Sequence, residues 1–223
     1  MVQVIEVSGL FNVRTSSPET PWLVRSGAAE GITPEGSAAL KALGVVLVLD
    51  LREPSEVGLV VHGVPVQSVQ LYGTEPPAIG RLEEIYESLL RERGHALTKA
   101  VSVIAEAKGG VLVHCTAGKD RTGLVVALAQ LASGMPPSEV IEDYTLSAPE
   151  VRAAREVIAL RVADAAPETD RAETLRLHLD SPPEAMQHAL SVIEELGGAE
   201  AYLLAHGLYA GHLTTLRRKH RGT

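Results

Sequence analysis

The stretch from residue 109 to residue 134 constrains the fold most, because its hydrophobic pattern changes period midway. It opens with GGVLVHC, a short β-branched apolar run that is typical of a buried strand. It closes with TGLVVALAQLASG, a pattern that predicts a helix ending at Gly134. A strand that passes through a tight turn into a helix is the repeating unit of folds with a parallel sheet. The sequence therefore predicts an α/β fold.

Three other segments near the N-terminus are also predicted strands. Each is short and rich in residues that favour strands: residues 2–7, 21–27 and 45–51. Before the third strand, Thr33 and Pro34 indicate the N-cap and first turn of a helix that ends at Gly44. The third strand brings Asp50 and Arg52 to its C-terminal end.

The remainder of the chain is predicted to be mainly helical. Apolar periodicity indicates helices at residues 78–91, 96–107, 138–146, 150–165, 171–178 and 182–196, with two more before the C-terminus. Gly94 is predicted to separate the first two, and Ser181 to cap the helix at 182–196. We therefore expect a single domain, residues 1–223, with a central, largely parallel sheet flanked by helices and a helical C-terminal half.

Composition narrows the class of protein. With 223 residues, of which 45% are hydrophobic, the chain can bury a substantial core. The formal net charge of -8 argues against general binding to nucleic acid or anionic membranes, which attract clustered Lys and Arg. No secretory leader and no apolar run of the roughly 18 residues needed to span a bilayer is visible. We expect a cytoplasmic protein without stable membrane insertion, although export without a cleaved leader stays open, and nothing indicates an oligomeric state.

The segment HCTAGKDRTG, residues 114–123, contains the only cysteine of the chain. A turn between a strand and a helix aims backbone N–H groups and the positive end of the helix dipole at one point, which favours an anion. Arg121 follows Cys115 by six residues, so its planar fork of donors can return beside the sulfur and grip two phosphate oxygens. Gly118 and Gly123 let the backbone approach the ligand closely. Because the same positive field lowers the pKa of a thiol, we expect Cys115 to be a thiolate.

Two other interpretations of the cysteine are weaker. A core cysteine beside a solvated loop would not require glycine, arginine and threonine at fixed offsets. A metal site would need more ligands, because Cys115 and the adjacent His114 cannot both turn to one ion. We expect neither a metal nor another cofactor.

These residues resemble the signature of the cysteine-dependent protein tyrosine phosphatases, HCxxGxxR followed by Ser or Thr. The longer form HCxxGKDRTG resembles that of the atypical bacterial tyrosine/serine phosphatases. Further segments are similar to the framework of that family: LVRSG at 23–27, ITPEG at 32–36, LGVVLVLDLR with Glu56 following, DYTLS at 143–147, PEAM at 183–186 and then GGAEAYLLAHG. The resemblance covers most of the chain and implies a tyrosine-phosphatase-like fold.

The residues of the loop suggest a mechanism. The Cys115 thiolate would attack phosphorus and form a cysteinyl-phosphate that water then hydrolyses, while Arg121 and the loop amides hold the equatorial oxygens. The resemblance implies that Thr122 hydrogen-bonds the departing sulfur, and His114 is expected to orient the loop. The predicted phosphate-binding loop comprises His114, Thr116, Ala117, Gly118, Lys119, Thr122 and Gly123.

The general acid is harder to assign. Tyrosine phosphatases commonly take it from a Trp-Pro-Asp loop, but Trp22, the only tryptophan, is followed by Leu-Val. The resemblance implies Asp120, within the loop, as the proton donor. Asp50 is the rival, because ligands gather at the carboxyl ends of parallel strands. Either carboxylate could instead have a structural role, paired with a nearby cation: Asp50 with Arg52, or Asp120 with Lys119.

The substrate is predicted only by class. We expect a phosphorylated protein, through phosphotyrosine and phosphoserine or phosphothreonine, or a phosphoinositide, because the resemblance links a loop lysine such as Lys119 to polyanionic inositol headgroups. Aromatic residues are only 3% of the chain, which favours permissive specificity, and Tyr72 is the candidate aromatic wall or else a loop anchor. Two alternatives remain: a phosphate-recognition module without turnover, and a rhodanese-like sulfurtransferase, whose usual loop is one residue shorter.

Overall fold

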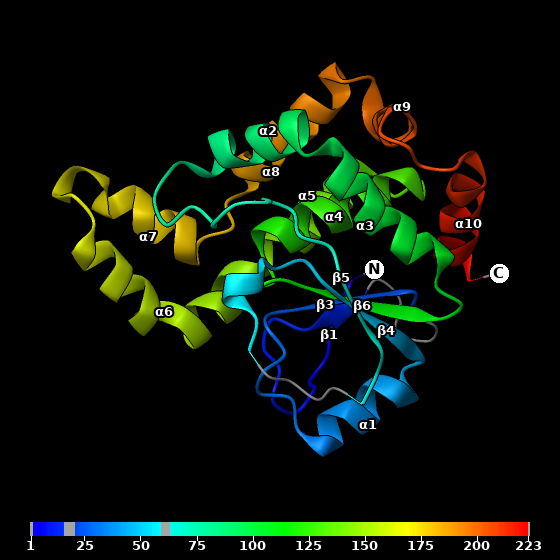
Figure 1. The fold of residues 1–223 in the computed structure, drawn as a ribbon, viewed down its shortest axis with the longest axis horizontal. Helices are drawn as coiled ribbons and strands as arrows, with labels where there is room; N and C mark the ends of the chain where they lie inside the picture. The colour runs from blue at the N-terminus through cyan, green and yellow to red at the C-terminus, as the bar shows by residue number, and fades with distance from the viewer. Residues whose placement is uncertain (1, 16–20, 59–62, 223) are drawn as a thin grey trace.

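The computed structural model describes residues 2–15, 21–58 and 63–222, which form a six-stranded sheet between helices (Figure 1). The strand order is β1-β2-β3-β6-β4-β5. The strands β3, β6, β4 and β5 run parallel to one another, whereas β1 and β2 pair antiparallel at one edge of the sheet. The strands are β1 (Gln3–Val4), β2 (Arg14–Thr15), β3 (Leu23–Ser26), β4 (Val45–Asp50), β5 (Val66–Ser68) and β6 (Gly110–His114). The predicted α/β class with a largely parallel sheet is confirmed.

The centre of the sheet brings three strand ends together. All five residues of β6 are buried, as expected of a parallel strand that is covered on both faces. In the register of the sheet, His114 at the end of β6 pairs with Ser26 of β3 on one side and Asp50 of β4 on the other. Cys115 is the next residue. The carboxyl ends of β3, β4 and β6 therefore converge directly before the cysteine.

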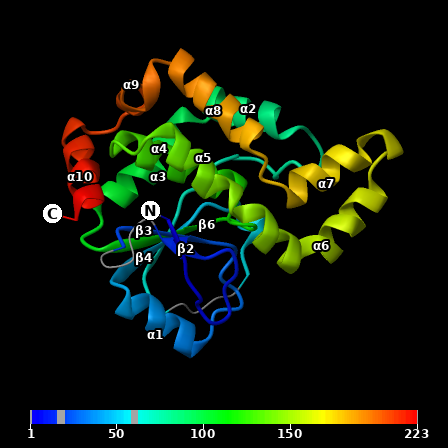
Figure 2. The same cartoon turned by 180° about the vertical axis from the view of Figure 1, so that it is seen from behind.

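Helices cover the two faces of the sheet unequally. Figures 1 and 2 show α1 on one face and most of the other helices on the opposite face. The helices are α1 (Pro34–Ala42), α2 (Leu82–Glu92), α3 (Gly94–Glu106), α4 (Asp120–Ala132), α5 (Pro137–Thr145), α6 (Ser147–Ala165), α7 (Arg171–Leu179), α8 (Pro183–Glu195), α9 (Gly198–Ala205) and α10 (Ala210–Arg221), with 3-10 turns η1 (Pro54–Glu56) and η2 (Glu168–Asp170). In both views α6 and α7 project together to one side of the body. The predicted helical C-terminal half is confirmed, and none of the described helices is long and apolar enough to cross a bilayer.

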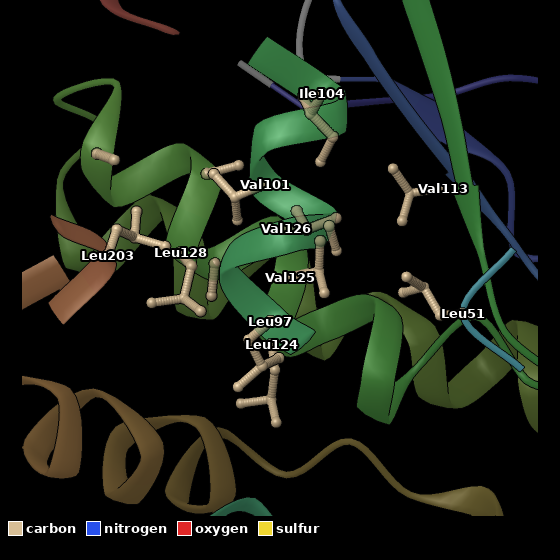
Figure 3. Packing of buried hydrophobic residues seen from close by; sticks show 14 of the residues in the cluster. Leu51, Leu97, Val101, Ile104, Val113, Leu124, Val125, Val126, Leu128 and Leu203 are labelled. Carbon is tan, nitrogen blue, oxygen red and sulfur yellow. The ribbon is translucent and has the colours of Figure 1, made fainter. Parts of the chain in front are cut away.

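The main core lies between the sheet and the larger helical layer. Figure 3 shows Leu97 and Val101 of α3 beside Leu124 and Leu128 of α4, with Val113 of β6 facing them. Helix α4 is apolar on nearly all sides because strands and helices surround it. Its first turn, which follows the cysteine, is therefore fixed by a large buried surface.

The structure corrects several predicted boundaries. The strand expected at residues 2–7 is confined to β1, and the short edge strands β2 and β5 were not predicted. Gly94 does not lie between the two helices, as predicted, but is the first residue of α3. Ser181 does not cap α8; its hydroxyl donates to the Thr145 carbonyl over 3.1 Å, and Pro182 occupies the N-cap. The Thr33 cap is confirmed, because its hydroxyl accepts the Gly36 N–H at 3.1 Å.

Candidate active site

The segment between β6 and α4 forms a tight loop with one obligatory glycine. Gly118 has a φ of +68°, in the left-handed region that favours glycine. A Cβ atom there would lie 2.1 Å from the carbonyl oxygen of Ser26, so even a methyl group has no room. Gly123 is different, because it lies within α4, where a Cβ would come within 3.2 Å of the Tyr144 ring. That Gly123 lets the backbone approach a ligand stays a prediction. In the structure, Gly123 allows α4 to pack closely against Tyr144.

Neighbouring strands and loops hold the turn from outside. The Asn12 side chain, whose backbone is also left-handed (φ 56°), donates to the carbonyls of Ala117 and Gly118 at 2.9 and 3.1 Å. Arg25 donates to the Gly118 carbonyl at 2.9 Å. The N–H of Ala28 donates to the Thr116 carbonyl at 3.1 Å. With these three carbonyls bound from outside, the backbone of the loop is held in place.

A buried ion network fixes Arg25. Asp143 lies between two arginines: its Oδ1 is 2.5 Å from Nε of Arg14, and its Oδ2 is 3.1 Å from Nη1 of Arg25. Burial raises the pKa of Asp143, but the two arginines outweigh that effect and hold the pKa below its ordinary value. Arg14 also donates to the Ser147 hydroxyl at 2.8 Å. The network therefore ties β2, β3, α5 and the start of α6 to the loop.

The thiol of Cys115 lies at the bottom of the loop and is 2% exposed. Burial alone would raise its pKa. The charge of Arg121 and the neighbouring Thr122 outweigh that effect, so the pKa of the thiol is lowered. This is the direction that the sequence predicts, and the thiolate itself stays a prediction.

Glu56 on η1 orients the loop arginine. Arg121 donates from Nη1 and Nη2 to the two carboxylate oxygens of Glu56, at 2.5 and 2.7 Å. The Thr116 hydroxyl donates to the same carboxylate. Burial raises the pKa of Glu56, but these donors outweigh it and lower the pKa to about 2. The sequence assigned Glu56 no site role; its only signal was its position shortly after the LDLR segment.

Asp50 is a structural carboxylate behind the loop. It is 3% exposed, and Arg52 donates to both of its oxygens, at 3.0 Å from Nε and 2.9 Å from Nη2. Burial raises the pKa of Asp50, but Arg52 and His114 outweigh it and lower the pKa. Arg52 also pairs with Glu30. Of the two interpretations of Asp50, pairing with Arg52 is the one that its contacts support.

His114 lies beneath the nucleophile. Its ring is fully buried, with Nδ1 3.2 Å from the Cys115 carbonyl oxygen and Nε2 3.8 Å from Oδ2 of Asp50. The ring therefore links the end of β4 to the backbone of the loop. This position agrees with the expectation that His114 orients the loop.

Asp120 opens α4, and one of its carboxylate oxygens is firmly held. Oδ1 accepts from the Tyr86 hydroxyl and from the Lys119 ammonium, each at 2.6 Å. The Tyr86 oxygen lies 2.8 Å from the Tyr144 hydroxyl, and since the Tyr86 proton points to Asp120, Tyr144 is the donor between the two phenols. Oδ2 has no hydrogen bond to another described residue, and the side chain is 18% exposed. The acid candidate thus keeps one oxygen available, and Tyr86, which the sequence did not single out, fixes the other.

Lys119 and Tyr72 occupy different positions at the loop. The Lys119 side chain is fully buried and its charge is paired with Asp120, so it does not face solvent as a second cation for a headgroup. The Tyr72 ring lies beside the site, with the guanidinium carbon of Arg121 5.2 Å from its centroid. The N–H of Tyr72 also donates to Glu53 at 2.8 Å. Tyr72 therefore both borders the site and is anchored by its own loop.

The described residues contain no group of three or more His, Cys, Asp or Glu side chains arranged to hold a metal ion. Of the predicted residues, the structure brings together Cys115, Arg121, Thr116, Thr122 and Asp120, with Tyr72 at the border and Asp50 behind. The arrangement offers a buried thiol with a lowered pKa and a guanidinium that Glu56 holds in place. It can bind a tetrahedral anion and attack its central atom.

Comparison with known proteins agrees with this chemistry. The chain is 32% identical over 140 residues to a tyrosine-protein phosphatase of Nostoc commune, an alignment that covers 56% of this chain and 48% of the relative. The chain thus spans only about half the length of that relative. It is 28% identical over 200 residues to PtpB of Mycobacterium tuberculosis, named a triple specificity protein phosphatase, with 67% of this chain and 72% of PtpB covered.

Two solved structures superimpose more loosely. TpbA of P. aeruginosa has a TM-score of 0.39 and 24% identity, over 74% of this chain and 96% of that one. The core catalytic domain of the PP-IP phosphatase SIW14 from S. cerevisiae has a TM-score of 0.41 and 19% identity, over 68% and 83%. The family model described as the tyrosine phosphatase family matches residues 8–221, almost the whole of this sequence. With the HCTAGKDRTG loop at the meeting point of three strands, this chain belongs to the tyrosine phosphatase family.

Proposed function

We propose that the protein hydrolyses phosphomonoesters through a cysteinyl-phosphate intermediate. The observation that carries the proposal is the lowered pKa of the Cys115 thiol beside Arg121, in the loop that joins β6 to α4. A thiolate is the nucleophilic form of cysteine, and guanidinium and amide donors stabilise the charge of a transferring phosphoryl group. We also propose that residues 1–223 form a single phosphatase domain in the cytoplasm.

In the first step, the Cys115 sulfur attacks phosphorus in line with the leaving oxygen. The sulfur–phosphorus bond forms as the ester bond breaks, and Asp120 gives a proton to the departing oxygen. Arg121 keeps N–H donors for the phosphoryl oxygens, since Glu56 accepts only one from each terminal nitrogen. The role of Asp120 is supported by its partly exposed carboxylate, whose Oδ2 makes no hydrogen bond within the described chain.

In the second step, water attacks the phosphoryl group and Asp120 takes the proton that the water loses. The sulfur–phosphorus bond breaks and the sulfur leaves as a thiolate. The Thr122 hydroxyl and N–H, which favour the thiolate in the free protein, stabilise the same charge here. Inorganic phosphate then departs and the loop returns to its starting state.

We infer that the substrates are phosphoproteins, with phosphotyrosine and phosphoserine or phosphothreonine both accepted, and that phosphoinositides are candidates. The name of the PtpB relative supports broad specificity, as does the low aromatic content of the chain, 3%. Tyr72 would contact the phenyl ring of phosphotyrosine, supported by its position over Arg121.

The test is kcat/KM on phosphotyrosine, phosphoserine and phosphoinositide substrates, with Cys115→Ser as the inactive variant. We expect the wild type to hydrolyse an aryl phosphate, with inhibition by vanadate and no effect of chelators. Cys115→Ser should lose at least about 10³-fold in kcat while it still binds phosphate ligands. Binding without turnover by the wild type would instead indicate a recognition module, and thiosulfate-to-cyanide transfer would indicate a sulfurtransferase.

A further inference from the structure

Helix α6 turns one arginine toward the body of the protein. Residues four apart share a helix face, and the buried residues of α6 follow that spacing: Ser147, Val151, Ala159 and Ala163. Arg155 occupies the central position of the same stripe and is half-buried. Val157, which lies two residues further along and therefore on the opposite side of the helix, is exposed. The Arg155 side chain therefore leaves α6 on its inward face.

This inward face lies next to the active site. Figures 1 and 2 both show the cyan η1 segment beside the first half of α6. Glu56, which holds Arg121, is the last residue of η1. Burial lowers the pKa of Arg155, whereas the charges of Cys115 and Glu56 act in the opposite direction, so the guanidinium is within electrostatic reach of the nucleophile.

Of the arginines of α6 and α7 in the described part of the chain, Arg155 and Arg161 lack an ion-pair partner; Arg161 is exposed, whereas Arg155 is half-buried. Ion pairs with carboxylates are made by Arg152, Arg171 and Arg176. Arg155 makes no hydrogen bond or ion pair with another residue in the described ranges 2–15, 21–58 and 63–222. It makes no hydrogen bond with Glu56, whose oxygens bind Arg121 and Thr116. Partial burial without a partner disfavours a cation, so an anion placed here would be bound strongly.

We propose that Arg155 binds a second phosphate group of the substrate, while the first phosphate lies in the Cys115 loop. The inference rests on the proposed phosphatase activity and deepens it. A guanidinium fork matches two phosphate oxygens, and Lys119, the other candidate cation, is buried against Asp120. Since α6 passes beside η1, whose Glu56 holds Arg121, the two phosphates would belong to one compact molecule, such as a ring that bears both.

The experiment uses two probes that differ only in the second group: phenyl phosphate and 1,3-phenylene bisphosphate. In the wild type we expect kcat/KM per phosphate group to be about tenfold higher for the bisphosphate, the effect of one charge-assisted contact. Arg155→Ala should reduce this preference to within about twofold and leave phenyl phosphate hydrolysis little changed. Arg155→Lys should keep part of the preference, because it keeps the charge but loses the fork. Arg161→Ala, an exposed arginine of the same helix, should keep all of it.

A binding measurement separates this inference from the proposed activity. In the Cys115→Ser background, calorimetry should give the same preference for the bisphosphate, again lost with Arg155→Ala. A soluble inositol bisphosphate and the same headgroup in phosphatidylcholine vesicles then distinguish a free polyphosphate from a lipid as the source of the second phosphate. The inference is overturned if Arg155→Ala weakens both phenyl probes equally or leaves the preference intact. A wild type that hydrolyses neither probe, yet shows the binding preference, would sink the proposed activity and keep the role of Arg155.

Discussion

At the residue scale, Glu56 decides where the guanidinium of Arg121 points. Two parallel hydrogen bonds, at 2.5 and 2.7 Å, fix the plane of the fork before any substrate arrives. With a pKa of about 2, the carboxylate stays charged through the range in which most carboxylates take up protons. Glu56 therefore keeps holding the arginine while most other carboxylates become protonated.

Removing that charge should impair positioning more than folding. We expect Glu56→Gln to lower kcat/KM by about tenfold or more, because a guanidinium displaced by a fraction of an ångström no longer matches the transition state. Glu83→Gln is the matched control, since both oxygens of Glu83 also bind one arginine, Arg176, and its pKa is likewise lowered to about 2. Steady-state kinetics with thermal melts checks both variants. Equal activity losses in the two variants would contradict a special role for Glu56.

Tyr86 provides a second test at the residue scale, through the oxygen of Asp120 that it holds. If Asp120 protonates the leaving group, Asp120→Asn should lower kcat by about 100-fold or more on an alkyl phosphate and far less on 4-nitrophenyl phosphate, whose leaving group needs no proton. Tyr86→Phe should show the same selectivity at about three- to tenfold, because it frees the carboxylate to rotate.

The control for that pair is Tyr202→Phe. Tyr202 is also buried, and its hydroxyl donates to the Leu90 carbonyl at 2.7 Å, away from the loop. It should cost stability without any dependence on the leaving group. A uniform loss on both substrates in Tyr86→Phe would show that Tyr86 is structural only, and selectivity in Asp50→Asn rather than Asp120→Asn would move the acid to Asp50.

At the element scale, the fold of the site depends on a strand, a five-residue turn and a helix that can be predicted from the sequence. The apolar run of β6 and the apolar surface of α4 are local patterns, so both could be predicted, and with them the positions of Cys115 and Arg121. Strand β2 could not be predicted, because Arg14 is polar and is buried against Asp143, which lies 129 residues away in the sequence. Glu56 was missed for the same reason: its partner is 65 residues distant.

The turn itself makes a prediction about glycine. Gly118→Ala combines a left-handed backbone with a Cβ placed 2.1 Å from the Ser26 carbonyl, so we expect a stability loss above about 2 kcal/mol and loss of turnover. Gly134→Ala, just beyond α4, is the matched control: its φ is also positive, but no atom lies within 4 Å of the added methyl. It should cost only about 1 kcal/mol and spare activity. Denaturant unfolding measures both, and similar losses would argue that strain, not the clash, dominates.

At the scale of the whole molecule, the site is held by an ion network that joins two N-terminal strands to helix α5. Asp143 of α5 binds Arg14 of β2 and Arg25 of β3, and Arg25 in turn holds the loop carbonyl of Gly118. The helical half of the chain is therefore coupled to the phosphate-binding loop by charge as well as by the core. A change in Asp143 should be felt in stability and in catalysis together.

Asp143→Asn should leave two buried arginines without their carboxylate and destabilise the fold by about 3–5 kcal/mol. Because the folded-state pKa of Asp143 is lowered, its contribution is complete above the unfolded value of about 3.9 and is lost as pH falls through the folded pKa. The difference in unfolding free energy between wild type and variant should therefore shrink below about pH 4 and stay constant above about pH 5. Glu200→Gln, which breaks the exposed pair with Arg217, should cost less than about 1 kcal/mol. Urea unfolding across this pH range measures both variants, and a loss in Asp143→Asn no larger than that of the control would show that packing, not the network, holds the loop in place.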